Sequence, residues 1–128
     1  MKTTILIILL LGISLSVSAQ QNESQQLLSA INTQRERMKL PPLVYRIGEQ
    51  LSVEERVMQI SFDFALSEDC ECDYESIAGD NSLMSLITKM TNIRKYQWLH
   101  FEQDARFAAI AVMKRDGIFY CVVRTYIN

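Results

Sequence analysis

Few residues in this chain could form a catalytic or metal-binding site. The strongest restriction is the histidine count, because His100 is the only histidine. A site built on two histidines cannot form within one copy of this chain. Asp69, Glu71, Asp73 and Glu75 lie close together, but carboxylates supply only oxygen ligands. A zinc site needs three or four His, Cys or carboxylate ligands in a fixed geometry. The sequence therefore predicts no metal and no cofactor, with a weak surface calcium contact at these acids as the alternative.

Nucleophilic catalysis is not favoured either. It needs a nucleophile beside a base that a third group orients. Ser82 and Ser85 are available nucleophiles, but His100 would have to be the base, and nothing in the spacing places it beside them. We therefore expect that this chain is not an enzyme.

The three cysteines fall in two places. Cys70 and Cys72 are neighbours in an acidic stretch, and Cys121 lies far along the chain. We expect a disulfide from Cys70 or Cys72 to Cys121, which would close a loop of about 50 residues and stabilise the fold by roughly 3–4 kcal/mol. The odd number leaves one thiol over. A metal site that uses the Cys-x-Cys pair is the rival interpretation.

The length and the charge of the chain restrict the classes of function that are open to it. The chain has 128 residues, of which 48% are hydrophobic and 22% charged, which is typical of one folded domain. With 13 basic and 15 acidic side chains, the formal net charge is −2. This balance argues against a nucleic-acid binder, which needs an excess of basic charge.

The N-terminus resembles a secretory signal. Lys2 is followed by an Ile/Leu-rich run over residues 5–13, and Val17 and Ala19 occupy the small-residue positions of a cleavage site. A membrane anchor is the alternative, but polar residues from Gln20 onward end the run before the ~20 residues that a span requires. We therefore expect a signal peptide over residues 1–19, a single domain over 20–128 with no membrane span, and a secreted, extracellular protein.

Hydrophobic spacing predicts three helices. The first covers residues 24–39, with Ser24 as N-cap, and ends at Pro41-Pro42. The second begins at the capping box Ser52–Glu55 and is apolar on more than one side, so we expect it to be well buried. Residues 68–80 are predicted to form a loop. A short third helix follows, capped by Asp80 or Asn81.

The C-terminal part predicts a β-hairpin. Residues 107–114 and 118–127 are β-prone runs, and Asp116-Gly117 between them is a strong hairpin signal. Helices that are separate in sequence from an antiparallel hairpin indicate an α+β fold.

These segments resemble the CAP superfamily, the group of cysteine-rich secretory proteins, venom antigens and pathogenesis-related class 1 proteins. The first helix carries Asn32 and Arg35 at the family spacing, and Pro41-Pro42-Leu43 resembles the connection that follows. Tyr74–Ala78 resembles the Gly-Glu-Asn-Ile/Leu-Ala motif, with Glu75 as the matching acid. The closing hairpin also fits. The resemblance implies a three-layer α-β-α sandwich, in which we expect the first two helices and the hairpin to share one core.

The departures from the family concern its groove, which usually holds two histidines and two acids that can take a divalent metal. The matching histidine positions fall within residues 66–74 and near Tyr96, and neither contains histidine. His100 lies four residues after Tyr96 and is a displaced ligand or an ordinary surface histidine. Glu75 remains, and we expect it to be structural, accepting hydrogen bonds from backbone N–H groups or from an arginine such as Arg35.

Two functions remain open. The first is a secreted, non-enzymatic CAP-like domain that interacts with an extracellular protein and has lost the family metal site. The alternative is an extracellular sterol or lipid binder, with Met90, Trp98 and Phe101 as contacts, because methionine and aromatic side chains adapt to apolar ligands. These residues can equally be core packing. The partner is thus an unidentified extracellular protein or lipid.

Signal cleavage is the first prediction. Export of the chain is expected to remove residues 1–19, because Val17 and Ala19 fit the cleavage pattern. Intact-mass measurement of the exported protein should give a chain that begins at Gln20, and a mass that includes Met1 would contradict the prediction.

Overall fold

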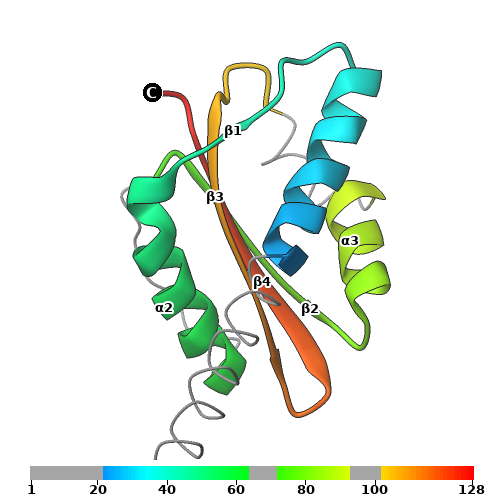
Figure 1. Ribbon diagram of the computed structural model, residues 1–128, viewed down its shortest axis with the longest axis vertical. Coiled ribbons are helices and arrows are strands. Elements are labelled where there is room, and N and C mark those ends of the chain that lie inside the picture. Colours follow the sequence, from blue (N-terminus) through cyan, green and yellow to red (C-terminus); the bar gives the residue numbers. More distant parts are fainter. Residues whose placement is uncertain (1–21, 64–71, 93–101) are drawn as a thin grey trace, which may run out of the picture.

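The computed structural model describes residues 22–63, 72–92 and 102–128, which form a helix–sheet–helix arrangement (Figure 1). A mixed four-stranded sheet has the strand order β1-β3-β4-β2. The first helix, described over residues 22–37, lies with α3 on one face of the sheet, and α2 lies on the other. The elements are β1 (Val44–Tyr45), the 3-10 helix η1 (Ile47–Glu49), α2 (Gln50–Phe62), β2 (Tyr74–Asp80), α3 (Leu83–Asn92), β3 (Phe107–Arg115) and β4 (Ile118–Tyr126). The predicted α+β class is confirmed.

The predicted hairpin forms the centre of the sheet. β3 and β4 pair without interruption from Phe107 opposite Tyr126 to Arg115 opposite Ile118. Asp116 and Gly117 have φ angles of 51° and 79°. A two-residue turn with positive φ at both central positions matches the right-handed twist of the strands, which explains why Asp-Gly is found here.

β2 corrects the expectation that residues 68–80 form a loop. Tyr74–Asp80 pairs antiparallel with β4 along its whole length. The polar residues Glu75, Ser76 and Asp80 interrupt the apolar alternation by which a strand is recognised in a sequence. Only Ser76 and Ala78 of this strand are buried. The apolar partner strand β4 supplies the hydrogen bonds and the packing that β2 lacks by itself.

The sheet separates two cores, so the expectation of one shared core is wrong. Alternate side chains of a strand point to opposite faces. Ile110 of β3 packs with Leu27 and Ile31 of the first helix and with Leu86 of α3. Val122 of β4 packs on the opposite face with the α2 residues and their neighbours, namely Val53, Val57, Ile60, Ala109, Ala111 and Tyr126.

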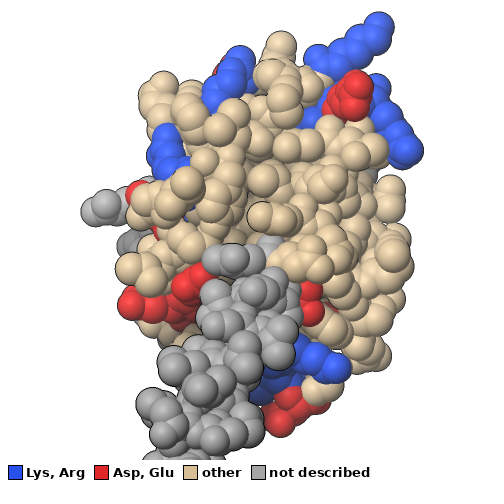
Figure 2. Space-filling model, in the orientation of Figure 1, with Lys and Arg blue, Asp and Glu red and all other residues tan. Residues whose placement is uncertain are grey.

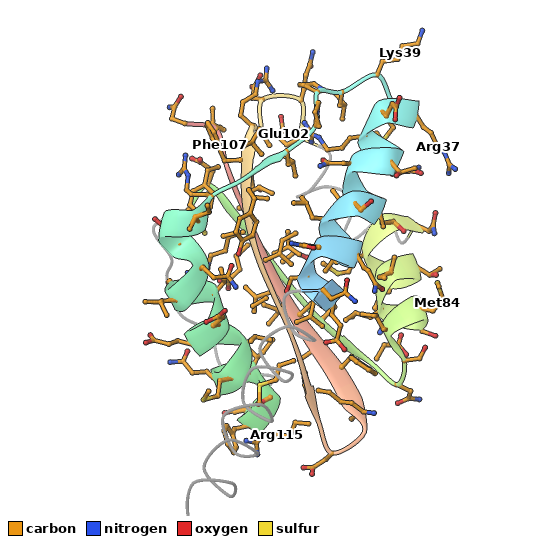
Figure 3. The ribbon with its side chains drawn as sticks, viewed as in Figure 1. Arg37, Lys39, Met84, Glu102, Phe107 and Arg115 are labelled. Carbon is orange, nitrogen blue, oxygen red and sulfur yellow. The ribbon has the colours of Figure 1, made fainter. Side chains whose placement is uncertain are left out.

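α2 is buried on only one side, which corrects the expectation of a well-buried helix. Leu51, Met58 and Phe62 are 76%, 52% and 69% exposed. They lie opposite the sheet-facing side because positions seven and eleven residues apart share a helix face. The side chain of Arg115, seen beside the end of α2 in Figure 3, stacks 3.5 Å from the centre of the Phe62 ring. Among the described residues nothing else forms a layer outside α2.

The helix ends also differ from the expectations. Residue 22 is already helical, so Ser24 lies inside the first helix. α2 begins at Gln50 without a side-chain cap, which leaves the Ser52 hydroxyl for another contact. The cap of α3 is Ser82, whose Oγ accepts from the N–H of Ser85 at 3.1 Å.

Asn32 and Arg35 hold the connection between the first helix and β1 in place by hydrogen bonds. The Asn32 amide donates to the carbonyl of Leu43 at 3.1 Å and accepts from its N–H at 2.8 Å. Arg35 is fully buried, and its guanidinium donates to the carbonyls of Pro41, Glu102 and Ala105 at 2.8–3.1 Å. These two residues therefore tie three separate chain segments together.

Arg35→Ala should destabilise the protein strongly. Three backbone carbonyls, among them the buried one of Ala105, would lose a charged donor, and we expect a loss of roughly 3 kcal/mol in the free energy of unfolding. Urea titration followed by circular dichroism would measure it. The control is Arg37→Ala on the same helix, because Arg37 is exposed and points away from the fold (Figure 3). Equal effects of the two substitutions would contradict this role for Arg35.

Candidate functional site

Glu75 lies at the centre of a largely buried charge cluster on the α2 face of the sheet. Its Oε2 accepts from Nε of Arg124 at 2.8 Å, and its Oε1 accepts from Nη2 and Nε of Arg56 at 3.2 and 3.3 Å. Nη1 of Arg124 donates to the Ser52 hydroxyl at 2.7 Å. We refer to Ser52, Arg56, Glu75 and Arg124 as the Glu75 cluster.

Local structure brings the four side chains together. Glu75 and Arg124 are directly opposite on β2 and β4, so their side chains share one face of the sheet. Ser52 and Arg56 are four residues apart on α2, and residues at that spacing lie on one side of a helix. The register of β2 against β4 and the position of α2 over the sheet thus build the cluster.

The electrostatics of the cluster are cationic. Two guanidinium groups face one carboxylate, and the side chains of Arg56, Arg124 and Glu75 are 4%, 8% and 15% exposed. Both carboxylate oxygens already accept charge-assisted hydrogen bonds. Such pairs are the strong class of hydrogen bond, so a metal ion at Glu75 would have to displace two cations.

The prediction that Arg35 is the arginine partner of Glu75 is wrong. Arg35 belongs to the opposite side of the sheet, where it holds the chain at Pro41 and Ala105. The sequence does contain a signal for the real partners, since Ser52 and Arg56 have helical spacing. That signal has meaning only once residues 74–80 are recognised as a strand that α2 covers.

The other candidate residues have structural contacts or lie outside the described ranges. Oδ2 of Asp73 accepts from the N–H of Ile127 at 2.7 Å. Ser82 and Ser85 share a hydrogen bond of 2.9 Å in the cap of α3. Within residues 22–63, 72–92 and 102–128, no group of three or more His, Cys, Asp or Glu side chains is placed to hold a metal ion. The remaining candidates outside these ranges are Asp69, Glu71 and His100.

The predicted disulfide to Cys121 is wrong. Cys121 is a free thiol, fully buried in the core beneath the first helix. Cys72 packs against the other core, beside α2. The sheet therefore separates the two sulfur atoms, while Cys70 lies outside the described residues. Burial raises the pKa of the Cys121 thiol to about 12, so this cysteine is inert at neutral pH.

Met90, which was proposed as a lipid contact, and Met84 of the same helix occupy different environments. Met90 is fully buried in the core with Leu86. Met84 is 72% exposed and points outward from α3, as Figure 3 shows. It lines an open hollow of about 490 Å³ against the first helix. Trp98 and Phe101 lie outside the described ranges.

The charged surface has no large patch of one sign on the face seen in Figure 2. Basic side chains gather near the top of that view, and acidic and basic groups mix at its lower end. In the described residues, no helix is both long enough and apolar enough to cross a membrane.

Comparison with solved structures places the fold. An outer surface protein from Borrelia burgdorferi superposes with a TM-score of 0.65 at 13% identity, covering 82% of this chain and 92% of that one. A cysteine-rich secretory protein from Staphylococcus aureus gives 0.64 at 13% identity, again over 82% of this chain. An extracellular protein with an SCP domain from Bacillus anthracis gives 0.61 at 10% identity, also over 82% of this chain.

The chain therefore has the CAP fold, also called the SCP fold, as the sequence resemblance predicts. It spans 38% of the Staphylococcus protein and 41% of the Bacillus protein. No protein-family model and no curated protein sequence matches it. The similarity to these proteins is therefore a similarity of fold and not of sequence.

Glu75→Gln should destabilise the fold. The substitution removes the carboxylate that accepts from both Arg56 and Arg124, and breaking such a buried ion pair costs about 3–5 kcal/mol. Urea unfolding at neutral pH measures the loss. Glu55→Gln, at an exposed position of α2, is the matched control and should change stability by less than about 0.5 kcal/mol.

Replacing Arg56, Glu75 and Arg124 together with Leu or Met should recover most of that stability, because apolar packing can replace a buried ion group. A triple variant as unstable as Glu75→Gln, or a Glu75→Gln protein as stable as the parent, would contradict this account of the cluster.

Proposed function

We propose that this chain is a secreted, non-enzymatic CAP-type domain that binds another extracellular protein and has lost the metal site of the family. The Glu75 cluster carries the proposal. The resemblance assigns Glu75 to the family groove, and here both of its oxygens bind arginine. Two fixed guanidinium groups satisfy the carboxylate internally, so the charge that would hold a metal is used to stabilise the fold.

The histidine count supports the same proposal independently. The family groove uses two imidazoles beside its acids, and this chain contains one histidine, His100. A single carboxylate already paired with arginine holds Zn²⁺ weakly compared with a site of three or four ligands. A hydrolytic or metal-assisted reaction at this position would lack both the metal and a positioned base.

Two observations support an extracellular role. The N-terminal residues fit a cleavable signal, and the structural neighbours are a cysteine-rich secretory protein, an outer surface protein and an extracellular protein. A binding role suits a domain in which the acid of the family groove, Glu75, is held in hydrogen bonds with arginine and is not free for catalysis. It is favoured over lipid or sterol binding because Met90 belongs to the core and the hollow beside Met84 is an open surface depression and not an enclosed cavity.

Zinc should leave the stability of the protein unchanged. Melting temperatures would be measured by calorimetry for the metal-free protein, with and without micromolar Zn²⁺, and again for His100→Ala. We expect zinc to leave the melting temperature of each protein unchanged, because Glu75 is occupied by arginine. A clear rise in melting temperature with zinc that disappears in His100→Ala would mean that His100 is a displaced ligand, and would overturn the loss of the metal site.

A further inference from the structure

The outward side of α2 is an apolar stripe that no other described segment covers. Leu51, Met58 and Phe62 are all more than half exposed. They are seven and four residues apart, the spacing at which one helix packs lengthwise along another. Single apolar side chains are ordinary on a protein surface, but a contiguous row of them marks an interaction surface. We refer to Leu51, Met58 and Phe62 as the α2 stripe.

One flank of the stripe has an acid in its N-terminal half. Glu54 lies between Leu51 and Met58 in the sequence, and together with Met58 and Met113 of β3 it lines the narrow hollow between α2 and β3. Oε1 of Glu54 accepts a hydrogen bond from Nε2 of Gln50 at 2.8 Å. Within the described ranges, no basic side chain forms an ion pair with Glu54. Its charge is therefore available to a cation of another molecule.

The same flank has a base at its C-terminal end. Arg115 comes two residues after Met113 on β3, so both side chains point to the α2 face of the sheet. The Arg115 guanidinium stacks on Phe62 at the end of α2 (Figure 3). Its Nε is buried without a hydrogen-bond acceptor, and no carboxylate in the described part of the chain pairs with it. The stripe thus runs from an acid to a base, neither of which has an ion-pair partner in its own copy.

This arrangement is complementary to itself. A two-fold axis across the stripe brings two copies of α2 side by side and antiparallel, with Leu51 of one copy against Phe62 of the other and both Met58 side chains near the axis. The flank that faces β3 is then on the same side of the pair in both copies. Glu54 of each copy lies about one helical turn from the Phe62 ring of the other, within reach of the Arg115 stacked there. A parallel pair would instead put the two acids at the same end.

Charge argues against a lipid surface as the occupant. Helices that lie on membranes have Lys and Arg beside their apolar face, whereas the α2 stripe is flanked by Glu54 and Glu55. Glu55 is on the flank opposite Glu54. In the antiparallel pair it stays at the solvent-exposed rim, where a charge contributes little. The flanking charges therefore favour a second copy over a membrane.

The size of the stripe indicates a weak contact. α2 has 13 residues and is therefore about 20 Å long. Three apolar side chains and two ion pairs along this length make an interface at or below about 1,200 Å² in total, the lower limit for stable complexes. The pair is therefore a transient dimer that forms at high protein concentration.

We infer that the α2 stripe binds a second copy of this chain, in an antiparallel two-fold dimer in which Glu54 of each copy pairs with Arg115 of the other. The inference goes beyond the proposed function, because it concerns the side of α2 that is turned away from the Glu75 cluster. Such a dimer presents two copies of the domain at once, which raises the apparent affinity for any partner that carries two binding sites.

Sedimentation velocity of the exported protein tests the inference, over about 10 μM to 1 mM, the range that suits a weak dimer. We expect the sedimentation coefficient to rise with concentration toward that of a dimer. Met58→Asp should weaken association at least about tenfold, because it would bury a charge without a partner. Met84→Asp makes the same change at an exposed methionine of α3, beyond the sheet, and is the matched control that should leave association unchanged.

Charge reversal tests the geometry of the pair. Glu54→Arg alone and Arg115→Glu alone should each weaken self-association at least about tenfold, because like charges then meet at both ends of the contact. An equal mixture of these two variants should form a dimer again, because each supplies the charge that the other needs at both ends. Melting temperatures verify that each variant is folded, and recovery in the mixture shows that neither substitution acts by unfolding.

Several outcomes would overturn the inference. They are a protein that stays monomeric at every concentration, equal effects of Met58→Asp and Met84→Asp, and a mixture that associates no better than its two components. Flotation of a monomeric protein with phosphatidylcholine vesicles, abolished by Met58→Asp, would assign the stripe to a lipid surface instead. None of these outcomes alters the zinc independence on which the proposed function is tested, so the two can fail separately.

Discussion

The uninterrupted pairing of β3 with β4 is the constraint on which the rest of this structure depends. Each strand has nine residues, and their ladder runs without a bulge from the Asp116-Gly117 turn to Tyr126. Because side chains alternate across a strand, one hairpin supplies apolar surface to both faces of the sheet at once. Helices must then cover both faces, and the two separate cores follow from this requirement.

The same sheet also determines which side chains surround Glu75. β2 contributes Glu75, β4 contributes Arg124, and α2 adds Arg56 and Ser52 from above. Removing charges from water is costly unless partners and hydrogen bonds are in place, so the carboxylate and both guanidinium groups depend on each other. A position that the family resemblance associates with metal binding is here a structural ion cluster, which supports the proposed use of the fold as a binding scaffold.

The short β1 has a consequence at the opposite edge of the sheet. Arg46 and Leu43 are held by β3 and Asn32, after which the chain turns into η1 and α2. β1 therefore pairs with only the first two residues of β3, and the following residues of β3 are nevertheless buried. The apolar residues Leu51, Met58 and Phe62 lie on the side of α2 that is turned away from the sheet and remain exposed.

The sequence by itself determined the features that depend on neighbouring residues. These are the helix periodicity and the Asp-Gly hairpin, whereas the contacts of Asn32 and Arg35 follow from the tertiary structure and the signal peptide remains a prediction. The tertiary structure alone decided that residues 74–80 form a strand, that Glu75 pairs with Arg56 and Arg124, and that Cys121 is separated from Cys72. The physical reason is that these depend on strand register and on which face of the sheet each helix covers, and both are set by contacts between segments far apart in the chain.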